Sequence, residues 1–241
     1  MVLKVLGSSS KGNCYILEAS DGILIIEAGV PAAEVKKAIG FNIGKVLACI
    51  VSHRHRDHSK FLKEIVSCGI KMLALEDVFA SHNIDRAFCK SIEPMKGYKV
   101  GGFHIFAFPV MHDVPCIGFV VEHAEMGRLL FVTDTMMLEY TFPRLNHILI
   151  ETNYCDRILQ DNIDAGVVPL SMRDRLLGTH MELQTAKDII KANDLSEVKE
   201  VILLHLSDNN SDAALFAQQM RRASGKPVYV AEKGLEINLW K

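Results

Sequence analysis

The chain has 241 residues, of which 49% are hydrophobic and 23% are charged, and its formal net charge is −2. This length and composition predict one large globular domain with a sizeable buried core. The slightly acidic balance excludes a surface that is basic overall, so any contact with nucleic acid has to come from a local group of cations.

No apolar stretch approaches the ~20 residues that a membrane-spanning helix needs. The N-terminal residues MVLKVLG are too few, and become polar too early, to form a signal peptide. The six cysteines are scattered without a C-x-x-C pair, which favours free thiols over disulfides. Together these features predict a reduced, cytoplasmic protein.

In the first half of the chain, short apolar segments alternate with turns, which predicts β-strands. The predicted strands cover residues 3–6, 14–18, 23–26, 46–51, 103–108, 117–121, 129–132 and 147–150. The run at 46–51 is apolar throughout, which is typical of a buried strand. Two helices are predicted among them, at residues 35–39 and from about 59 to 66.

The second half is richer in helix. Thr179 and Glu182 form a capping-box pattern that predicts a helix start at Thr179. Ser211 is the expected N-cap of a last helix that stops at Gly225. Strands are predicted at residues 201–206, 228–231 and 236–240. This order of elements predicts two sheets with helices outside them, an α/β layered sandwich.

The sequence SHRHRDH at residues 52–58 directly follows the predicted strand at 46–51. A strand end holds a loop firmly, and His53 and His55 project to the same side of an extended segment. Asp57 and His58 lie at a helix entry and can turn toward a second point. Such a density of imidazole and carboxylate groups suits zinc first, with manganese and iron also open. The alternative is a basic surface loop that happens to contain three histidines.

Three further candidate ligands, His112, Asp134 and His205, each follow an apolar strand. Taken singly, a histidine there is more often hydrogen-bonded in the core, and an aspartate more often caps a turn. In company with the SHRHRDH motif, all three favour a site for two divalent metal ions.

These residues resemble the metallo-β-lactamase superfamily: H-x-H-x-D-H, a histidine after a strand, Thr-Asp-Thr, and a late histidine. The resemblance covers essentially the whole chain and implies a single hydrolase domain over residues 1–241 with a four-layer αββα sandwich. It places His53, His55 and His112 on one metal. It places Asp57, His58 and His205 on the other, with Asp134 bridging the two.

Within the superfamily the chain looks like the YycJ/WalJ-type branch, which is proposed to contain DNA exonucleases and is akin to the RNase Z and β-CASP nucleases. The similar stretches are GSSSKGNC at 7–14, SK at 59–60, TDT at 133–135, ETN at 151–153, GTH at 178–180 and HLS at 205–207. The chain departs in carrying arginine at both variable positions of the histidine motif, and Met181-Glu182 where the branch tends to have Leu-Ser. These departures bear on which substrate the site accepts, and not on the metal ligands.

Two divalent ions bring four positive charges, against which Asp57, Asp134 and a bridging hydroxide return three. The centre keeps about one positive charge, which favours an anionic group such as a phosphodiester. Metal ions also lower the pKa of bound water from 15.7 toward ~7, which creates the nucleophile. Asp134 is expected to orient the hydroxide.

His180, expected just inside the helix start at Thr179, is the second catalytic candidate, because a helix N-terminus suits phosphate. It would bond a phosphate oxygen or protonate the leaving group; the alternative is a surface histidine near a cap. Glu151 would orient a metal-binding histidine, or be a surface carboxylate at a strand end. The expected substrate contacts are Arg54, Arg56, Lys60, Arg173 and Asn13, with Lys63, Arg175, Ser8, Ser9 and Lys11 as further candidates. Solvated charges on a helix, and a plain hairpin turn at residues 8–13, explain these residues as well.

The sequence therefore predicts a two-metal phosphodiesterase or nuclease acting on DNA or RNA. A small-molecule hydrolase of an ester, lactone, thioester or cyclic nucleotide remains the alternative, because one fold hosts many reactions. A non-catalytic binding protein on the same fold fits less well, because all seven ligand positions hold competent side chains. No role is predicted for Asn153, and His82, His104, His123 and His147 are expected to be structural.

Overall fold

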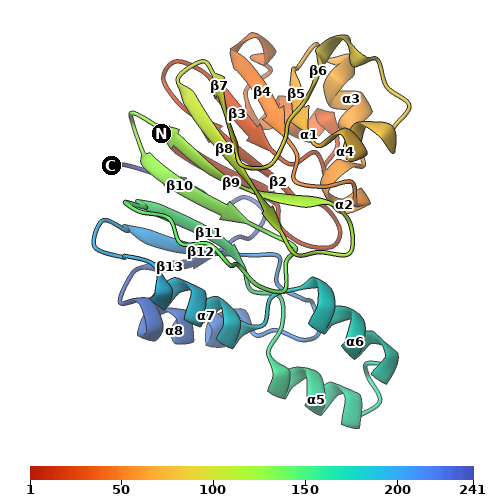
Figure 1. The fold of residues 1–241 in the computed structure, drawn as a ribbon, viewed down its shortest axis with the longest axis vertical. Helices are drawn as coiled ribbons and strands as arrows, with labels where there is room; N and C mark the ends of the chain where they lie inside the picture. The colour runs from red at the N-terminus through yellow and green to blue at the C-terminus, as the bar shows by residue number, and fades with distance from the viewer.

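Apolar strands form two seven-stranded β-sheets that pack face to face, with helices outside them (Figure 1). The structure is a computed structural model and describes residues 1–241. The predicted αββα sandwich is confirmed. None of the helices combines the length and apolar composition that a segment crossing a bilayer would need.

The first sheet has the strand order β14-β1-β2-β3-β4-β5-β6. Its strands are β1 (Val2–Gly7), β2 (Cys14–Glu18), β3 (Ile23–Ile26), β4 (Val46–Ile50), β5 (Met72–Ala74), β6 (Cys89–Ser91) and β14 (Glu236–Asn238). Strands β14 to β3 pair antiparallel, whereas β3 to β6 pair parallel.

The second sheet has the order β13-β12-β11-β10-β9-β8-β7. Its strands are β7 (Lys96–Val100), β8 (Phe103–Val110), β9 (Cys116–His123), β10 (Gly127–Val132), β11 (His147–Glu151), β12 (Glu200–Leu204) and β13 (Val228–Val230). Strands β7 to β10 pair antiparallel, and β10 to β13 pair parallel. The carboxyl ends of β10, β11 and β12 therefore meet at one edge of this sheet.

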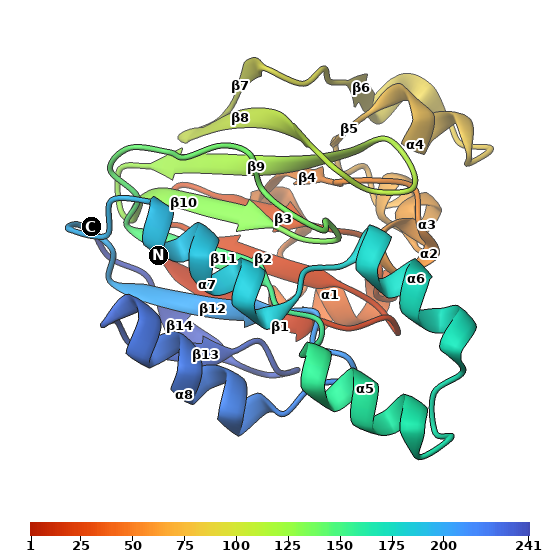
Figure 2. The same ribbon diagram turned by 60° about the horizontal axis from the view of Figure 1, so that its bottom comes forward.

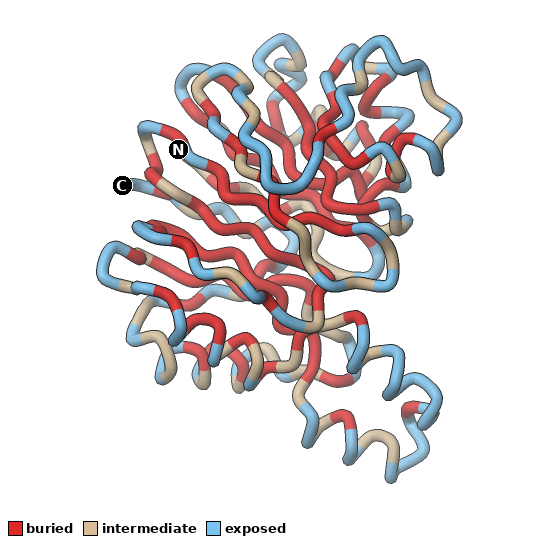
Figure 3. Tube along the Cα trace, in the orientation of Figure 1, coloured by how far each residue is buried: buried red, intermediate tan, exposed pale blue.

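The helices are α1 (Ala32–Ala38), α2 (Arg56–Ser59), α3 (Leu62–Ser67), α4 (Glu76–Ala80), α5 (Asp156–Asp164), α6 (Leu170–Thr179), α7 (Leu183–Ala192) and α8 (Ala213–Ser224), with short 3₁₀ turns η1 (Ile43–Lys45) and η2 (Arg86–Phe88). Helices α7 and α8 cover the outer face of the second sheet (Figure 2). Helices α5 and α6, which the sequence did not predict, project from the body as a largely exposed arm (Figure 3).

Continuous apolar runs form strands that are buried on both faces. On β12, Ile202 and Leu204 belong to the 45-residue core that includes residues of both sheets. Val201 and Leu203 point the other way, into the 21-residue core beneath α7 and α8. Because successive side chains alternate between faces, a strand between two apolar layers shows no polar alternation.

Two predicted helix starts are wrong. Helix α7 begins at Leu183 rather than Thr179, because Glu182 is its N-cap and accepts hydrogen bonds from the backbone N–H groups of Gln184 and Thr185. Helix α8 is capped by Asp212 rather than Ser211. A carboxylate satisfies the free N–H groups of a first turn as well as a hydroxyl does. The predicted stop at Gly225 is confirmed by its left-handed backbone, with φ of 68°.

Candidate metal centre

The candidate ligands come from loops at the ends of four strands. The SHRHRDH motif follows β4, His112 follows β8, Asp134 follows β10 and His205 follows β12. These strands belong to both sheets, so the loops meet at one edge of the sandwich. A site built on strand ends keeps a fixed geometry because the strands beneath it are buried.

The first group of side chains that could hold a metal ion contains His53, His55, His112 and Asp134, whose ligand atoms all lie within 4.8 Å of one another. His112 Nε2 lies 3.1 Å from His55 Nδ1. His53 Nε2 lies 3.7 Å from Asp134 Oδ2. Two ligands at about 2.1 Å from a tetrahedral ion are about 3.4 Å apart, so these separations suit a shared cation.

The second group contains Asp57, His58, His205 and the same Asp134. His58 Nε2 lies 3.3 Å from Asp57 Oδ2 and also 3.3 Å from Asp134 Oδ2. His205 Nδ1 lies 2.9 Å from Asp134 Oδ1. Asp134 thus stands between the two groups and offers one carboxylate to both.

Two buried imidazole nitrogens that face the candidate ligands have no hydrogen-bond partner, namely His53 Nε2 and His205 Nε2. An unpartnered polar atom in a protein interior is costly. The ring centroids of His53 and His58 are only 4.2 Å apart. Divalent metal ions explain both the crowding and the missing partners, so the side chains present fit a metal centre.

Neighbouring groups fix the orientation of the first group. His112 Nδ1 donates to the carbonyl oxygen of Thr179 at 3.0 Å, which leaves the lone pair of Nε2 facing His55. His53 Nδ1 lies 2.9 Å from Ser52 Oγ. Burial lowers the pKa of His53 well below its usual value and also lowers the pKa of His112. Both imidazoles are therefore held neutral, as a metal ligand must be.

The second group attracts positive charge. Burial would raise the pKa of Asp134, but His205 and His58 outweigh it and hold that pKa well below its usual value. Burial would lower the pKa of His205, but Asp134 outweighs it and raises that pKa. The Asp134 carboxylate stabilises the positive charge of an imidazolium, and it would stabilise a bound metal cation for the same reason.

Three residues at this edge adopt left-handed backbone conformations although they are not glycine: Glu27 (φ 70°), Asp134 (φ 48°) and His205 (φ 53°). Such conformations persist only where the surroundings enforce them. His205 is held by two hydrogen bonds, from its N–H to Ser8 Oγ at 2.9 Å and from Asn153 Nδ2 to its carbonyl oxygen at 2.8 Å.

Glu151 lies buried behind the second group, where Oε1 accepts hydrogen bonds from His180 Nδ1 at 2.6 Å and from His205 Nδ1 at 3.3 Å. Glu151, His180, His205 and Asp134 form a third cluster with metal-binding geometry. The expectation that His180 sits at a helix N-terminus is wrong, because α6 ends at Thr179 and His180 follows its last turn. His180 approaches the centre through Glu151 instead.

Glu27 was not predicted from the sequence. It is fully buried, follows β3 and accepts a hydrogen bond from the backbone N–H of Ser52 at 3.3 Å. Its Oε1 lies 3.5 Å from His58 Nδ1. The signal that singled out Asp134, an acidic residue directly after an apolar strand, is also present at Glu27.

The expected substrate contacts are dispersed. Arg54, Arg56, Lys60 and Arg173 are exposed, and Arg54 pairs with Asp77 at 3.2 Å. Asn13 is fully buried, with its amide nitrogen 3.0 Å from His58 Nε2. The structure thus places Asn13 beneath the candidate ligands rather than on the surface.

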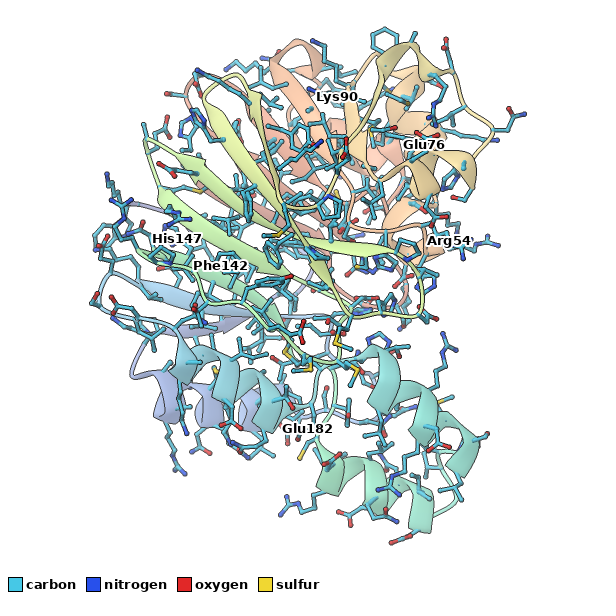
Figure 4. All side chains as sticks on the ribbon, in the orientation of Figure 1. Arg54, Glu76, Lys90, Phe142, His147 and Glu182 are labelled. Atoms are coloured by element: carbon cyan, nitrogen blue, oxygen red, sulfur yellow. The ribbon has the colours of Figure 1, made fainter.

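The four histidines that were expected to be structural lie away from both groups. His82 Nε2 lies 2.9 Å from Ser59 Oγ, His104 is exposed, and His123 Nε2 lies 3.1 Å from Asp21 Oδ1. His147 pairs with Glu200 at 2.6 Å and begins β11, so it lies at the opposite end of the sheets from Arg54 (Figure 4).

The family model of the Metallo-beta-lactamase superfamily matches residues 9–139, more than half of the chain. The chain belongs to the metallo-beta-lactamase superfamily. The family together with the histidine and aspartate cluster indicates divalent metal binding.

Two curated proteins are similar over most of the chain. Exodeoxyribonuclease YycJ of Bacillus anthracis is 26% identical over 225 residues, covering 86% of this chain and 83% of its own. Exodeoxyribonuclease WalJ of Streptococcus pneumoniae is 23% identical over 227 residues, covering 86% and 82%. The resemblance to the YycJ/WalJ-type branch is therefore confirmed.

Solved structures share the fold at low identity. The metallo-beta-lactamase fold protein YhfI of Bacillus subtilis has a TM-score of 0.71 at 16% identity, covering 98% of this chain and 99% of that one. Human tRNase Z, short form, has a TM-score of 0.68 at 14% identity, covering 99% of each chain.

Proposed function

We propose that this metallo-beta-lactamase domain is a two-metal phosphodiesterase that cleaves nucleic acid, with DNA as its substrate. The observation that carries the proposal is the convergence of seven side chains into two groups that share Asp134. Its similarity to two exodeoxyribonucleases supports DNA. The 45-residue core includes strands of both sheets, which supports treating residues 1–241 as one hydrolase domain.

His53, His55 and His112 would hold one ion and Asp57, His58 and His205 the other, with Asp134 offered to both. Zinc is the first candidate, because the ligands are mainly imidazoles. When bound, such ions lower the pKa of water and neutralise charge on a phosphate. Asp134 would also orient the attacking water.

His180 is the proposed proton donor to the leaving oxygen. Burial would lower its pKa, but the Glu151 carboxylate outweighs this and raises it, so the imidazole carries a proton more readily. Glu151 Oε1 accepts a hydrogen bond from His180 Nδ1 at 2.6 Å, which leaves Nε2 as the nitrogen that would give its proton to the leaving oxygen. A general acid of this kind contributes typically 10²–10⁴-fold to the rate.

A metal-reconstituted assay tests this function. It compares labelled single-stranded DNA, RNA and bis(p-nitrophenyl) phosphate with ester and lactone substrates. We expect turnover of DNA and of the small phosphodiester. Turnover of the carboxylic substrates alone would replace the nuclease assignment by that of a small-molecule hydrolase.

A further inference from the structure

A pocket of about 670 Å³ lies beside the candidate metal centre, on the side of Asp57 and His205. The loop between β1 and β2 forms one wall, and the residues directly after His205 form another. Ser8 belongs to the first wall, and its Oγ accepts a hydrogen bond from the backbone N–H of His205. Pockets of roughly 300–1,000 Å³ accommodate small organic molecules, so this one has room for a nucleotide.

The pocket wall is built against the backbone that carries Asp57. Gly29 lines the pocket, and a Cβ added to it would lie 1.8 Å from the carbonyl oxygen of Asp57. The N–H of Asn13 donates to that same oxygen at 2.7 Å, and the N–H of Gly29 donates to Asn13 at 2.9 Å. A molecule in the pocket therefore has a fixed position relative to the metal centre.

The pocket and the candidate metal centre share loops. Leu206, which lines the pocket, directly follows His205, and Lys60, also in the lining, lies three residues after Asp57. The centre itself is partly open to solvent, because the side chains of His55 and Asp57 are 31% and 18% exposed.

Two exposed ion pairs connect opposite walls of the pocket. Lys11 of the β1–β2 loop pairs with Asp208 at 2.8 Å, and Lys233 pairs with Glu34 at 2.6 Å. Exposed pairs of this kind are weak because water and salt screen them. A third lysine, Lys60, has no carboxylate within ion-pair distance, and its Nζ lies 5.0 Å from the ring centroid of Phe61.

The three lysines of the pocket are balanced by three carboxylates, Glu34, Asp208 and Glu232. The pocket lining therefore carries no net formal charge. A phosphate group is a stronger partner than an exposed carboxylate, because it offers more acceptor oxygens and more charge.

We propose that this pocket binds the unpaired nucleotides of a DNA strand next to the phosphate at the metal centre. DNA phosphates displace Asp208 from Lys11 and Glu34 from Lys233, and Lys60 binds a further phosphate. Only a single strand fits, because a base must leave the stack to enter a pocket. This inference rests on the proposed function and specifies its substrate as single-stranded DNA.

The test measures the Kd of the metal-loaded protein for a fluorescent, phosphorothioate-linked single-stranded DNA that resists cleavage. Asp208→Asn and Glu34→Gln each free a lysine, so we expect each to lower Kd roughly 3- to 10-fold, the size of one added lysine–phosphate contact. Lys60→Ala is expected to raise Kd and to reduce the slope of log K against log salt by about 0.7.

Glu93→Gln is the matched control. Glu93 forms an exposed pair with Lys96 at 2.8 Å, and Lys96 begins β7, the outermost strand of the second sheet. This variant changes the net charge as Asp208→Asn does, and it also frees one lysine, but far from the pocket. We expect its Kd to equal that of the wild type.

An Asp208→Asn variant that binds DNA no more tightly than Glu93→Gln would overturn the inference. The two proposals fail separately. If the wild type cleaves single-stranded DNA while the pocket variants leave Kd unchanged, only the pocket assignment is wrong. If the wild type cleaves neither DNA nor bis(p-nitrophenyl) phosphate, the proposed function is wrong, whatever the Kd values show.

Discussion

Individual residues at the metal centre carry conformational costs that the surrounding structure has to offset. Left-handed backbones at Asp134 and His205 cost about 1–3 kcal/mol each. Buried imidazoles without partners add to this cost. These costs fall on the candidate metal ligands, as expected for a site whose side chains are held in place before an ion binds.

Asp134→Asn tests the shared carboxylate. Asparagine tolerates a left-handed backbone, so the variant is expected to fold while losing the charge that faces both ligand groups. We expect turnover of bis(p-nitrophenyl) phosphate to fall by more than about 100-fold, because even residues that only support a metal ligand are worth 10–100-fold. Circular dichroism checks the fold, and activity close to that of the wild type would contradict the bridging role.

His55→Ala tests the first ligand group without creating a buried cavity, because the His55 side chain is 31% exposed. We expect turnover to be abolished while the chain stays folded. His104→Ala is the control, since it removes an exposed imidazole on β8 and should leave turnover unchanged. Equal activities of the two variants would remove His55 from the proposed ligand set.

Gly29→Ala tests how tightly the loops pack behind Asp57. The added Cβ would lie 1.8 Å from the Asp57 carbonyl oxygen, so one of the two backbones has to move. We expect metal affinity, measured by competition with a chromogenic chelator, to fall roughly 10- to 100-fold. Gly44→Ala is the matched control because its Cβ would meet no atom within 4 Å. A similar affinity in both variants would show that the Asp57 loop is not tightly held.

At the scale of elements, a turn of one sheet forms hydrogen bonds with a turn of the other. Glu125, between β9 and β10, accepts hydrogen bonds from the backbone N–H of Ser20 at 2.9 Å and from its hydroxyl at 2.5 Å. Ser20 lies between β2 and β3, so this contact links a hairpin of each sheet. These hydrogen bonds lower the pKa of Glu125 to about 2 from its ordinary value of 4.5.

A lowered folded-state pKa gives a definite pH dependence. The contribution of Glu125 to stability is present above about pH 4.5 and is lost as the pH falls toward about 2. We expect Glu125→Gln to be less stable than the wild type in urea at pH 7 and to approach it at pH 2. Glu122→Gln, on the same hairpin, is the control. A constant difference between Glu125→Gln and wild type across this range would exclude the proposed linkage.

At the scale of the whole molecule, bound metal ions would join loops from both sheets. Ligands that bind only the folded state stabilise it, by about 4 kcal/mol at a free concentration 1,000 times Kd. Chelation is therefore expected to lower Tm by roughly 8–16 °C, since each kcal/mol shifts Tm by about 2–4 °C in a chain of this size. The His53→Ala variant already lacks one ligand, so chelation should lower its Tm by less than that of the wild type. An identical loss in the variant would place the stabilising ion elsewhere.

Much of the architecture could be predicted because it depends on local patterns. The strands at 14–18 and 23–26 match β2 and β3, since apolar runs between turns have few alternatives. Strands β6 and β7 were missed because they are polar and largely exposed, and β5 was missed because its apolar run is only three residues long. The arm formed by α5 and α6 was missed as well, because only a small core of Tyr154, Leu159 and Val168 marks it.

The sequence alone determined the candidate ligands, because seven imidazole and carboxylate residues after apolar strands are a chemical pattern that can be recognised before folding. Only the tertiary structure decided their partners. It buried Asn13 beneath His58, placed Glu27 and Glu151 behind the ligands, and moved His180 from a helix start to the end of α6. These positions depend on how strands far apart in sequence pair and twist, which no local pattern encodes.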